Sequence, residues 1–311
     1  MAAPELPFVA APVGVGPEVD RAAHTAASIW GLPAPQLIRH GMNGVYAAGH
    51  EVVVRVGRPT VDAAAAVELA TRLADAGIPV AVPVRHREPI VVHVDGLQVV
   101  AVQRLHPSGE PVDWVAVGAA VARLHALPAA IVPPAHPLPR GLRFPWWDFP
   151  AMLADVGPDV AAADRRALAG LEAAVARHAT VVAEALTAPG SERVVCHGDV
   201  HPGNVVQTAH GPVLVDWDLV CDEPPGWDHA ALLTWTERWG GEPGLYERFA
   251  EGYGRDLRGE PFAQAAAELR LVAATLMRVR AGRTDPSARD EALRRLRWWR
   301  GDPDAPPWRA A

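Results

Sequence analysis

One stretch constrains this chain more than any other: residues 194–218, which read VVCHGDVHPGNVVQTAHGPVLVDWD. Two short apolar runs in it each lead into a cluster of carboxylate, imidazole and amide side chains, with a Gly or Pro at almost every bend. A strand that ends in a polar loop, turns back as a short hairpin and ends again at a carboxylate brings side chains from separate strand ends together. We therefore expect Asp199, Asn204 and Asp216 to form one site.

The chemistry of these three side chains indicates a metal site beside a proton acceptor. Asp199 and Asn204 are five residues apart, and Pro202-Gly203 forces a turn between them. Asn204 and Asp216 offer an amide and a carboxylate oxygen, a hard and incomplete ligand set that suits Mg²⁺ completed by water and phosphate oxygens. Asp199 would then accept a substrate proton. The alternative is a polar loop in which Asp199 and Asn204 only cap backbone groups.

The amino-acid composition argues against several classes of chemistry. The chain has no lysine, which excludes a Walker P-loop and lysine Schiff-base chemistry, including pyridoxal phosphate anchoring. Its four serines include none in a Gly-x-Ser-x-Gly elbow, which disfavours that type of serine hydrolase. The two cysteines form no Cys-x-x-Cys pair, so neither a zinc ribbon nor a disulfide scaffold is expected.

Charge and hydropathy bear on partners and location. The net charge of -7 argues weakly against nucleic acid as a partner, because phosphate binding needs a basic surface. The apolar stretches are interrupted before they reach the length of a membrane span, and the N-terminus resembles no signal or transit peptide. We expect a cytoplasmic protein without a membrane partner.

The apolar periodicity changes character after about one hundred residues. The first part alternates like an antiparallel sheet with one amphipathic helix at 61–76 that ends before Gly77, and a short helix precedes it. The run at 51–56 is nearly continuous and β-branched, which predicts a strand buried on both faces. The predicted elements of this part are a helix at 19–30 and strands at 37–40, 51–56, 90–94 and 97–103.

The rest of the chain reads as mainly helical apart from the central hairpin. A loop rich in Pro and aromatic residues is predicted at 128–149. The predicted helices are at 115–127, 159–187, 227–239, 244–253, 262–281 and 287–299.

The motif His197-Gly198-Asp199-x-His201-x-x-Asn204, followed by apolar residues, a turn and Val-Asp-Trp, is similar to that of the aminoglycoside phosphotransferase and choline kinase family, relatives of the protein kinases. The resemblance covers about residues 35–235. It implies an α+β, protein-kinase-like two-lobe fold, with a small antiparallel sheet plus one helix followed by a larger, mainly helical lobe.

The resemblance also implies how the chain divides. Residues 1–103 would form an N-terminal nucleotide-binding lobe, residues 104–110 a hinge, and residues 111–311 a C-terminal lobe for catalysis and acceptor binding. The oligomeric state is left open.

Carried over by position, the motif implies roles for single residues. Asp199 resembles the catalytic base, and Asn204 and Asp216 resemble the metal ligands. His197 is interpreted as a brace of the loop. Asp218 is either a local cap or a further partner of the metal site.

A kinase-like fold also requires nucleotide-binding residues upstream of the motif. Gly41, Asn43 and Gly44 resemble the loop over the nucleotide phosphates, and Arg55 stands where the family usually has lysine. An arginine there can hold phosphate oxygens, although with a different geometry from an ammonium group. Glu68, the acid in the interior of the predicted helix, is our candidate partner of Arg55, with a solvated helix acid as the alternative.

Further positions follow from the same resemblance. Gln103 and Leu105 fall at the hinge, where main-chain groups would bind the base of the nucleotide. His125 ends a Leu-His helix and is interpreted as a structural brace, and Asp228 resembles a family aspartate that packs beneath the catalytic loop.

Tryptophans that could line an acceptor pocket recur in the C-terminal half, and ordinary packing is the alternative. A cationic acceptor would suit aromatic rings beside acids. These residues are Trp146, Trp147, Trp227, Trp235 and Trp239.

The sequence therefore predicts an ATP-dependent kinase, with GTP also possible, that uses Mg²⁺ to phosphorylate a hydroxyl of a small molecule such as an aminoglycoside-like antibiotic, an amino alcohol or a sugar. One alternative is a metal-dependent phosphoesterase that binds metal through His197, His201, Asp216 and His229. The other is a catalytically silent kinase-like protein that binds a ligand. Nothing in the sequence selects the acceptor.

Overall fold

The computed structural model describes residue 13 and residues 16–41, 43–58, 61–84, 88–187 and 192–309. The chain forms two compact units. Unit 1 comprises the described part of Met1–Asp113 together with Leu127–Leu138 and Pro202–Val220, and unit 2 comprises Trp114–Ala126, Pro139–His201 and Cys221–Ala311 as far as they are described. The lobe boundaries proposed from the sequence, with a hinge at 104–110, stay a prediction.

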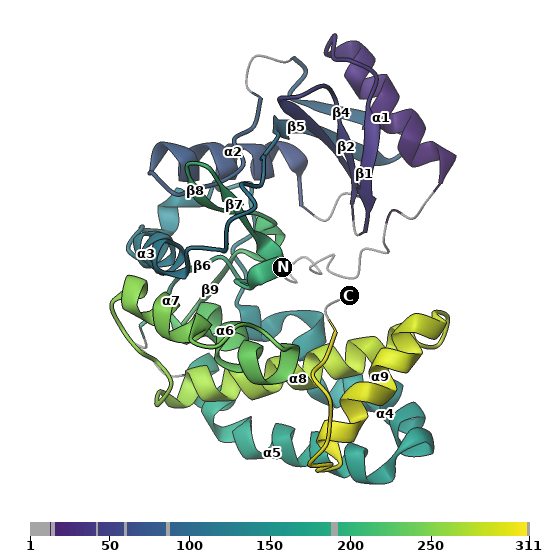
Figure 1. Ribbon diagram of the computed structural model, residues 1–311, viewed down its shortest axis with the longest axis vertical. Coiled ribbons are helices and arrows are strands. Elements are labelled where there is room, and N and C mark those ends of the chain that lie inside the picture. Colours follow the sequence, from purple (N-terminus) through teal and green to yellow (C-terminus); the bar gives the residue numbers. More distant parts are fainter. Residues whose placement is uncertain are drawn as a thin grey trace. The chain divides into compact units, whose positions relative to one another are not determined.

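Unit 1 is built on a five-stranded antiparallel sheet with the order β1-β2-β3-β5-β4. Figure 1 shows α1 lying against this sheet, where it contacts β3, β4 and β5. The predicted antiparallel sheet is confirmed, and β2 is an addition, because four residues after a turn give too short a pattern to read. The elements are α1 (Pro17–Ile29), β1 (Gln36–His40), β2 (Gly44–Ala47), β3 (Val52–Gly57), α2 (Ala63–Asp75), β4 (Val91–Val94) and β5 (Leu97–Gln103).

The core of this sheet lies under α1. Val54 and Val56 of β3 are fully buried and pack in one apolar cluster with Val19 and Trp30, whereas Val53 and Arg55 are only half-buried. The expectation of a strand buried on both faces is therefore wrong. In an antiparallel sheet one face can carry the core while the other keeps access to polar groups, and a β-branched run does not distinguish the two cases.

A β-hairpin after the central motif belongs to unit 1. The main-chain N–H of Leu214 donates to Pro79 O at 2.9 Å, and that of Ser108 donates to Gln207 O at 2.9 Å, so the hairpin is tied to the rest of the unit by backbone bonds. This confirms the predicted short hairpin. The remaining elements of unit 1 are η1 (Ala129–Ile131), η4 (Pro202–Asn204), β7 (Val205–Thr208), β8 (Gly211–Leu214) and η5 (Trp217–Leu219).

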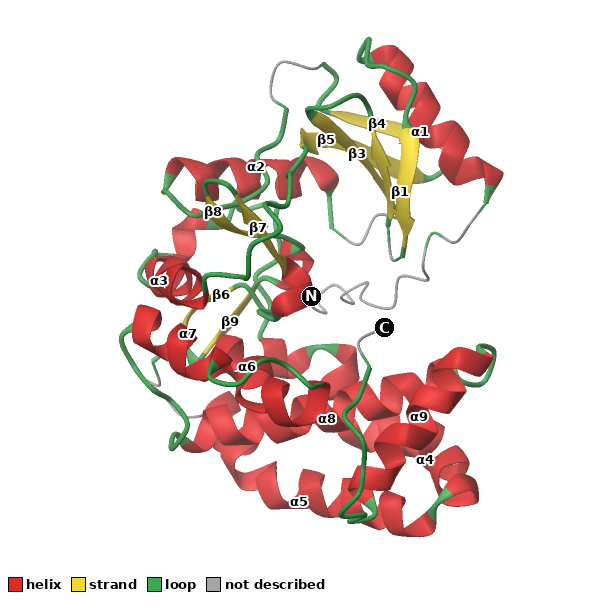
Figure 2. Ribbon diagram, viewed as in Figure 1, coloured by secondary structure: helices red, strands yellow, loops and turns green. Residues whose placement is uncertain are grey.

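Unit 2 is mainly helical and packs around α8, which contacts α4, α5, α6 and α9 (Figure 2). Its small sheet pairs β6 with β9 antiparallel, with Cys196 opposite Cys221. The elements are α3 (Trp114–His125), η2 (Gly141–Arg143), η3 (Pro145–Trp147), α4 (Phe149–Ala163), α5 (Arg165–Thr187), β6 (Val194–Cys196), β9 (Cys221–Glu223), α6 (Gly226–Trp239), α7 (Leu245–Tyr253), α8 (Pro261–Ala281) and α9 (Pro286–Trp299).

The one long helix predicted at 159–187 is instead two helices. Asp148 caps α4 by accepting from the N–H of Ala151 at 3.0 Å, and Asp164 caps α5 by accepting from the N–H of Arg166 at 3.0 Å. The backbone of Asp164 is extended, which separates the helices. Aspartate is a favoured N-cap residue, so both starts carried a local signal that the apolar spacing masked.

None of the helices in the described ranges combines the length and apolarity that a membrane span requires.

Candidate active site

In unit 1, the side chain of Arg55 contacts three polar residues. Its Nη2 lies 2.5 Å from Asp218 Oδ2 and 3.6 Å from Asp216 Oδ1. In the amide orientation that satisfies both groups, the Asn43 side-chain oxygen accepts from Arg55 Nη2 at 2.7 Å and from Nε at 3.1 Å. Burial opposes the charge on Arg55, but the two carboxylates outweigh it and raise the pKa of the guanidinium. We call these four residues the Arg55 cluster.

Asn204 and Asp216 are held together by the backbone of the same unit. The N–H of Val215 donates to the main-chain oxygen of Asn204 at 3.0 Å, which fixes the end of η4 beside the residue that precedes Asp216. Asn204 is buried, and the side chain of Asp216 is about half exposed at 47%. Their amide and carboxylate oxygens are hard donors and do not complete a coordination shell, so the pair fits Mg²⁺ with water and phosphate oxygens as the other ligands.

The backbone of Asp216 is unusual. Its φ of 66° lies in the left-handed region, which among the non-glycine residues of the described ranges only Asp95 shares. Holding such a conformation costs on the order of 1–3 kcal/mol and persists only where the surroundings enforce it. The conformation is therefore consistent with a functional role for this carboxylate.

Asp199 lies in unit 2, in the loop after β6. Its Oδ1 accepts from Arg270 of α8, and its Oδ2 lies 3.4 Å from His201 Nε2. Burial alone would raise the pKa of Asp199, but the hydrogen bond from His201 and the charge of Arg270 hold it well below its usual range. About a quarter of the side chain, 26%, is exposed. Asp199 is therefore an accessible carboxylate that stays ionised.

A buried brace holds the backbone in front of Asp199. Asp228 of α6 accepts from the N–H of His197 and the N–H of Gly198, both at 2.8 Å, and its Oδ2 lies 3.1 Å from His125 Nε2. Gly198 has a φ of 92°, a conformation that side chains rarely adopt. The structure confirms the interpretation of Asp228 and His125 as architectural residues.

Electrostatics make the brace an ion pair. Burial would lower the pKa of His125, but the hydrogen bonds with Asp228 and Cys196 outweigh it and raise the pKa to about 9. For Asp228, burial alone would raise the pKa, but the hydrogen bond with His125 outweighs burial and lowers it. At neutral pH the pair is therefore imidazolium and carboxylate.

The remaining predicted nucleotide residues lie in unit 1. Gly44 begins β2 and pairs with Val56, and Gln103 ends β5, where its N–H donates to Val82 O at 2.8 Å. Gly41 donates its N–H to Asn43 O at 3.1 Å, and Leu105 is half-buried just after β5. The loop residue Met42 lies outside the described residues.

Glu68 is placed away from its predicted partner. Its Oε1 accepts from Arg72 Nη2 at 2.6 Å one helical turn later, while Arg55 contacts Asp216 and Asp218. The structure thus does not bring Glu68 and Arg55 together, and the proposed pair stays a prediction.

The tryptophans of unit 2 take part in packing. Trp235 stacks on His201 with ring centroids 5.2 Å apart and on Trp239 with centroids 5.3 Å apart, at interplanar angles of 10° and 15°. Trp147 is buried, and its ring centroid lies 4.6 Å from that of Trp227. These contacts favour the packing interpretation over an aromatic lining for the acceptor.

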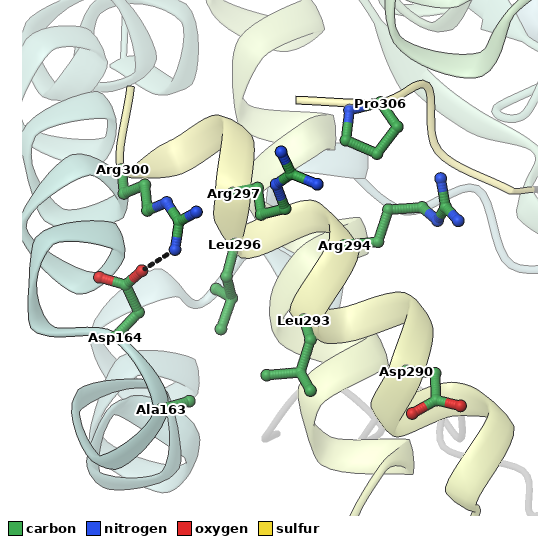
Figure 3. Close-up of a pocket in the computed structure, with 9 residues that line it drawn as sticks. All are labelled: Ala163, Asp164, Asp290, Leu293, Arg294, Leu296, Arg297, Arg300 and Pro306. Carbon is green, nitrogen blue, oxygen red and sulfur yellow. Dashed lines mark hydrogen bonds and ion pairs between the residues drawn. The ribbon is translucent and has the colours of Figure 1, made fainter. Parts of the chain in front are cut away.

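A cavity of about 330 Å³ lies elsewhere in unit 2 and contains none of the predicted site residues. Figure 3 shows Arg300, which directly follows α9, pointing toward Asp164, with Leu293 and Leu296 on α9. Arg300 Nη1 lies 3.3 Å from Asp164 Oδ2. Its arginines are occupied by neighbouring acids, since Arg297 and Arg300 both contact Asp302. We assign it no part in the site.

Sequence reasoning missed Arg270. It lies 71 residues after Asp199, and its Nη1 also donates to Gly198 O at 3.0 Å. The only local signal was a lone cation between Leu269 and Leu271, two buried residues of an apolar helix. A charge placed among core residues needs a partner, although the sequence does not say which one.

Known structures show what class of fold this is. A spectinomycin phosphotransferase in complex with ADP and spectinomycin is 15% identical, with a TM-score of 0.62 and coverage of 89% of this chain and 93% of that one. An amicoumacin kinase in complex with AMP-PNP and Ca²⁺ is 13% identical, with a TM-score of 0.65 and coverage of 91% and 93%. A choline/ethanolamine kinase family protein from Mesorhizobium loti is 19% identical, with a TM-score of 0.58 and coverage of 92% and 96%. The fold is thus α+β and protein-kinase-like.

The family follows from the sequence match. Residues 34–268 match the family described as the phosphotransferase enzyme family, and the chain belongs to that family. A comparison with curated protein sequences gave no match.

Proposed function

We propose that this protein is an ATP-dependent phosphotransferase that uses Mg²⁺ to phosphorylate a hydroxyl group of a small molecule. The observation that carries the proposal is the Arg55 cluster, which joins the predicted phosphate-binding cation to a predicted metal ligand within one compact unit. Family membership supports the same reaction class.

In this proposal, Arg55 and Asn43 bind the nucleotide phosphates. The guanidinium presents several donors in a plane, and the two acids keep it charged and oriented before the nucleotide arrives. The phosphates compete with Asp216 and Asp218 for these donors. Arg55 thus provides positive charge where the transferred group carries negative charge.

Asn204 and Asp216 would hold the magnesium ion through their side-chain oxygens. When bound, Mg²⁺ supplies neutralisation of charge on the phosphate oxygens. The chain contributes rigidity: the bond from Val215 to Asn204 O fixes one ligand, and the enforced left-handed backbone fixes the other.

Asp199 would orient the acceptor hydroxyl. Because its pKa is held far below neutrality, it is a weak base and accepts the hydroxyl hydrogen bond before it takes the proton late in the transfer. Arg270 and His201 keep the carboxylate in place, and the brace under Gly198 fixes the backbone that carries it. Positioning of this kind accounts for most catalysis of phosphoryl transfer.

The phosphoesterase alternative loses support from burial. His197 and His229 are completely buried, and a ring nitrogen of His229 lies 3.0 Å from the hydroxyl of Tyr246. A hydrolytic metal centre needs an open coordination position that water can reach. We therefore do not retain these histidines as metal ligands.

The acceptor is proposed by class only. The solved relatives carry spectinomycin in one case and belong to a choline/ethanolamine kinase family in another. We propose an aminoglycoside-like antibiotic, an amino alcohol or a sugar, with ATP or GTP as donor and a cytoplasmic setting that supplies the nucleotide.

A phosphate-transfer screen tests the proposal. Labelled ATP and GTP are offered with amino sugars, amino alcohols and sugars to the wild type, Asp199→Asn and the exposed control Glu237→Gln. We expect Asp199→Asn to lower the transfer rate by about 10²–10⁴ with nucleotide affinity nearly unchanged, and the control to be fully active. Binding of Mg-ATP with no transfer to any acceptor would instead support the catalytically silent alternative.

A further inference from the structure

A cluster of two histidines and one glutamate lies at one end of the β3/β5 ladder in unit 1. The register pairs Val52 with Gln103, and the ladder continues one step further, because the N–H of Arg104 donates to Glu51 O at 2.8 Å. This step brings His50 and Glu51, in the turn between β2 and β3, beside His106, which follows β5. We call His50, Glu51 and His106 the turn cluster.

The side chains of the turn cluster face one another. His50 Nδ1 lies 2.6 Å from Glu51 Oε1, and the rings of His50 and His106 stack with centroids 4.3 Å apart at an interplanar angle of 19°. One ligand atom from each of the three residues lies within 4.8 Å of the others. The guanidinium of the neighbouring Arg104 donates to Gly49 O at 3.0 Å.

From this geometry we propose that the turn cluster binds one divalent transition-metal ion of the Zn²⁺ class. Two imidazole nitrogens and one carboxylate oxygen are the donor set that Zn²⁺ and its neighbours prefer, whereas Mg²⁺ and Ca²⁺ prefer oxygen donors alone. The site is thus chemically distinct from the magnesium ligands Asn204 and Asp216, and it does not depend on the proposed function.

The ligands reach coordination distance by side-chain rotation. A tetrahedral ion with bonds of about 2.0–2.1 Å needs ligand atoms about 3.3 Å apart, so atoms within 4.8 Å of one another must approach by at most about 1.5 Å. All three residues are exposed, and the side chains of His50 and Glu51 are 79% and 73% accessible, so the core does not oppose this movement.

A second group with metal-ligand chemistry is fully buried and already occupied. It consists of His125, Cys196 and Asp228 in unit 2. Asp228 accepts two backbone N–H groups in addition to contacting His125, and burial raises the pKa of the Cys196 thiol well above its usual value, which disfavours the thiolate that a metal needs. We therefore assign metal binding to the turn cluster.

A bound ion would cross-link two chain segments. His106 would be tied to the turn of residues 48–51, which the bond from Ala48 N–H to Val52 O already closes at 2.9 Å. The ion would therefore slow amide hydrogen exchange in residues 104–106 and in this turn, a readout that needs no activity assay.

Titration of the tag-free, chelator-treated protein with ZnCl₂ tests the proposal. We expect one equivalent to bind, with at least 10-fold weaker binding in His50→Ala and in His106→Ala, and several-fold weaker binding in Glu51→Gln. His93→Ala, which removes another exposed histidine of the same sheet, is the matched control and should bind as the wild type does.

Two results would overturn the assignment. The first is no saturable Zn²⁺ binding, or unchanged binding in the double variant His50→Ala/His106→Ala. The second comes from Co²⁺ as a spectroscopic probe: a sulfur-to-cobalt charge-transfer band would locate the ion at a cysteine, Cys196 or Cys221, and not at the turn cluster. Bands typical of nitrogen and oxygen ligands that vanish in the double variant would support the turn cluster.

Discussion

Replacing Asp228 by asparagine removes one charge from the buried brace and keeps its shape. The asparagine oxygen can retain the bonds to His197 N–H and His125, but its amide group then faces the N–H of Gly198. One bond to a charged group, about 1.5–3 kcal/mol, is lost, and the other two weaken. We expect a loss of about 3 kcal/mol in the stability of unit 2, at the lower end of the range for breaking a buried ion pair.

The raised pKa of His125, to which Asp228 and Cys196 both contribute, gives a similar magnitude. Its rise from 6.5 to about 9 corresponds to roughly 3 kcal/mol, since each tenfold change in proton affinity is about 1.4 kcal/mol. Because the folded value is raised, this stabilisation is complete below pH 6.5 and is lost as the pH rises through about 9. For Asp228 the folded value is lowered, so its contribution is present above pH 3.8 and is lost as the pH falls through the lower value. The effect of Asp228→Asn should therefore be greatest between about pH 4 and 6.5.

Hydrogen exchange measures this loss for one unit at a time, which matters because a chain of two compact units need not unfold in one step. At pH 6.5, slow amides of α3 and α8 should exchange about 100-fold faster in Asp228→Asn than in the wild type. Glu237→Gln, on the same helix and exposed, should change nothing. A difference below about 0.5 kcal/mol, or one that stays the same at pH 10, would refute the ion-pair reasoning.

Three further predictions concern the metal pair, the phosphate-binding cation and helix packing. Asp216→Asn should remove most of the gain in ATP affinity that Mg²⁺ provides, measured by calorimetric titration with and without the ion; an unchanged gain would argue against Asp216 as a ligand. Arg55→Lys keeps the charge but loses the planar donor set that contacts two acids, so the Kd for ATP should rise about 10-fold; equal affinity would show that charge alone suffices. Gly252→Ala places a Cβ against the carbonyl oxygen of Val115 between α7 and α3 and should destabilise unit 2 by about 1–3 kcal/mol in thermal unfolding, whereas Gly259→Ala, with open space around it, should not.

Residues 194–218 were the most predictable part of the chain because their information is local. Turn residues, strand ends and polar clusters succeed one another there, and the structure bears out the hairpin of β7 and β8 that they predict. The antiparallel sheet and the helices from 226 onward were likewise readable from periodicity. What failed was set by tertiary context: the burial of β3 depends on what covers each face of the sheet.

Partnerships between distant residues were the least predictable. Glu68 is the one acid in the interior of the expected helix, which makes it the candidate partner of Arg55, yet it pairs with Arg72 at a spacing of four residues. Arg55 instead contacts Asp218, 163 residues away, which the sequence left open as a cap or a partner of the metal site. Spacing rules apply within an element and not between elements, so such pairs become visible only with the fold.

Charge balance explains why the loop before the hairpin needs residues that its motif does not contain. Asp199 and Asp228 place two carboxylates around one short backbone segment, and the backbone N–H groups of His197 and Gly198 satisfy only one of them. Two cations from other helices compensate the pair: Arg270 of α8 contacts Asp199, and His125 of α3 is protonated against Asp228. Loss of either cation would leave one uncompensated negative charge and disfavour ionisation of the remaining carboxylates. Only Asp199 belongs to the motif of residues 197–204, whereas Asp228 and both cations come from helices of unit 2.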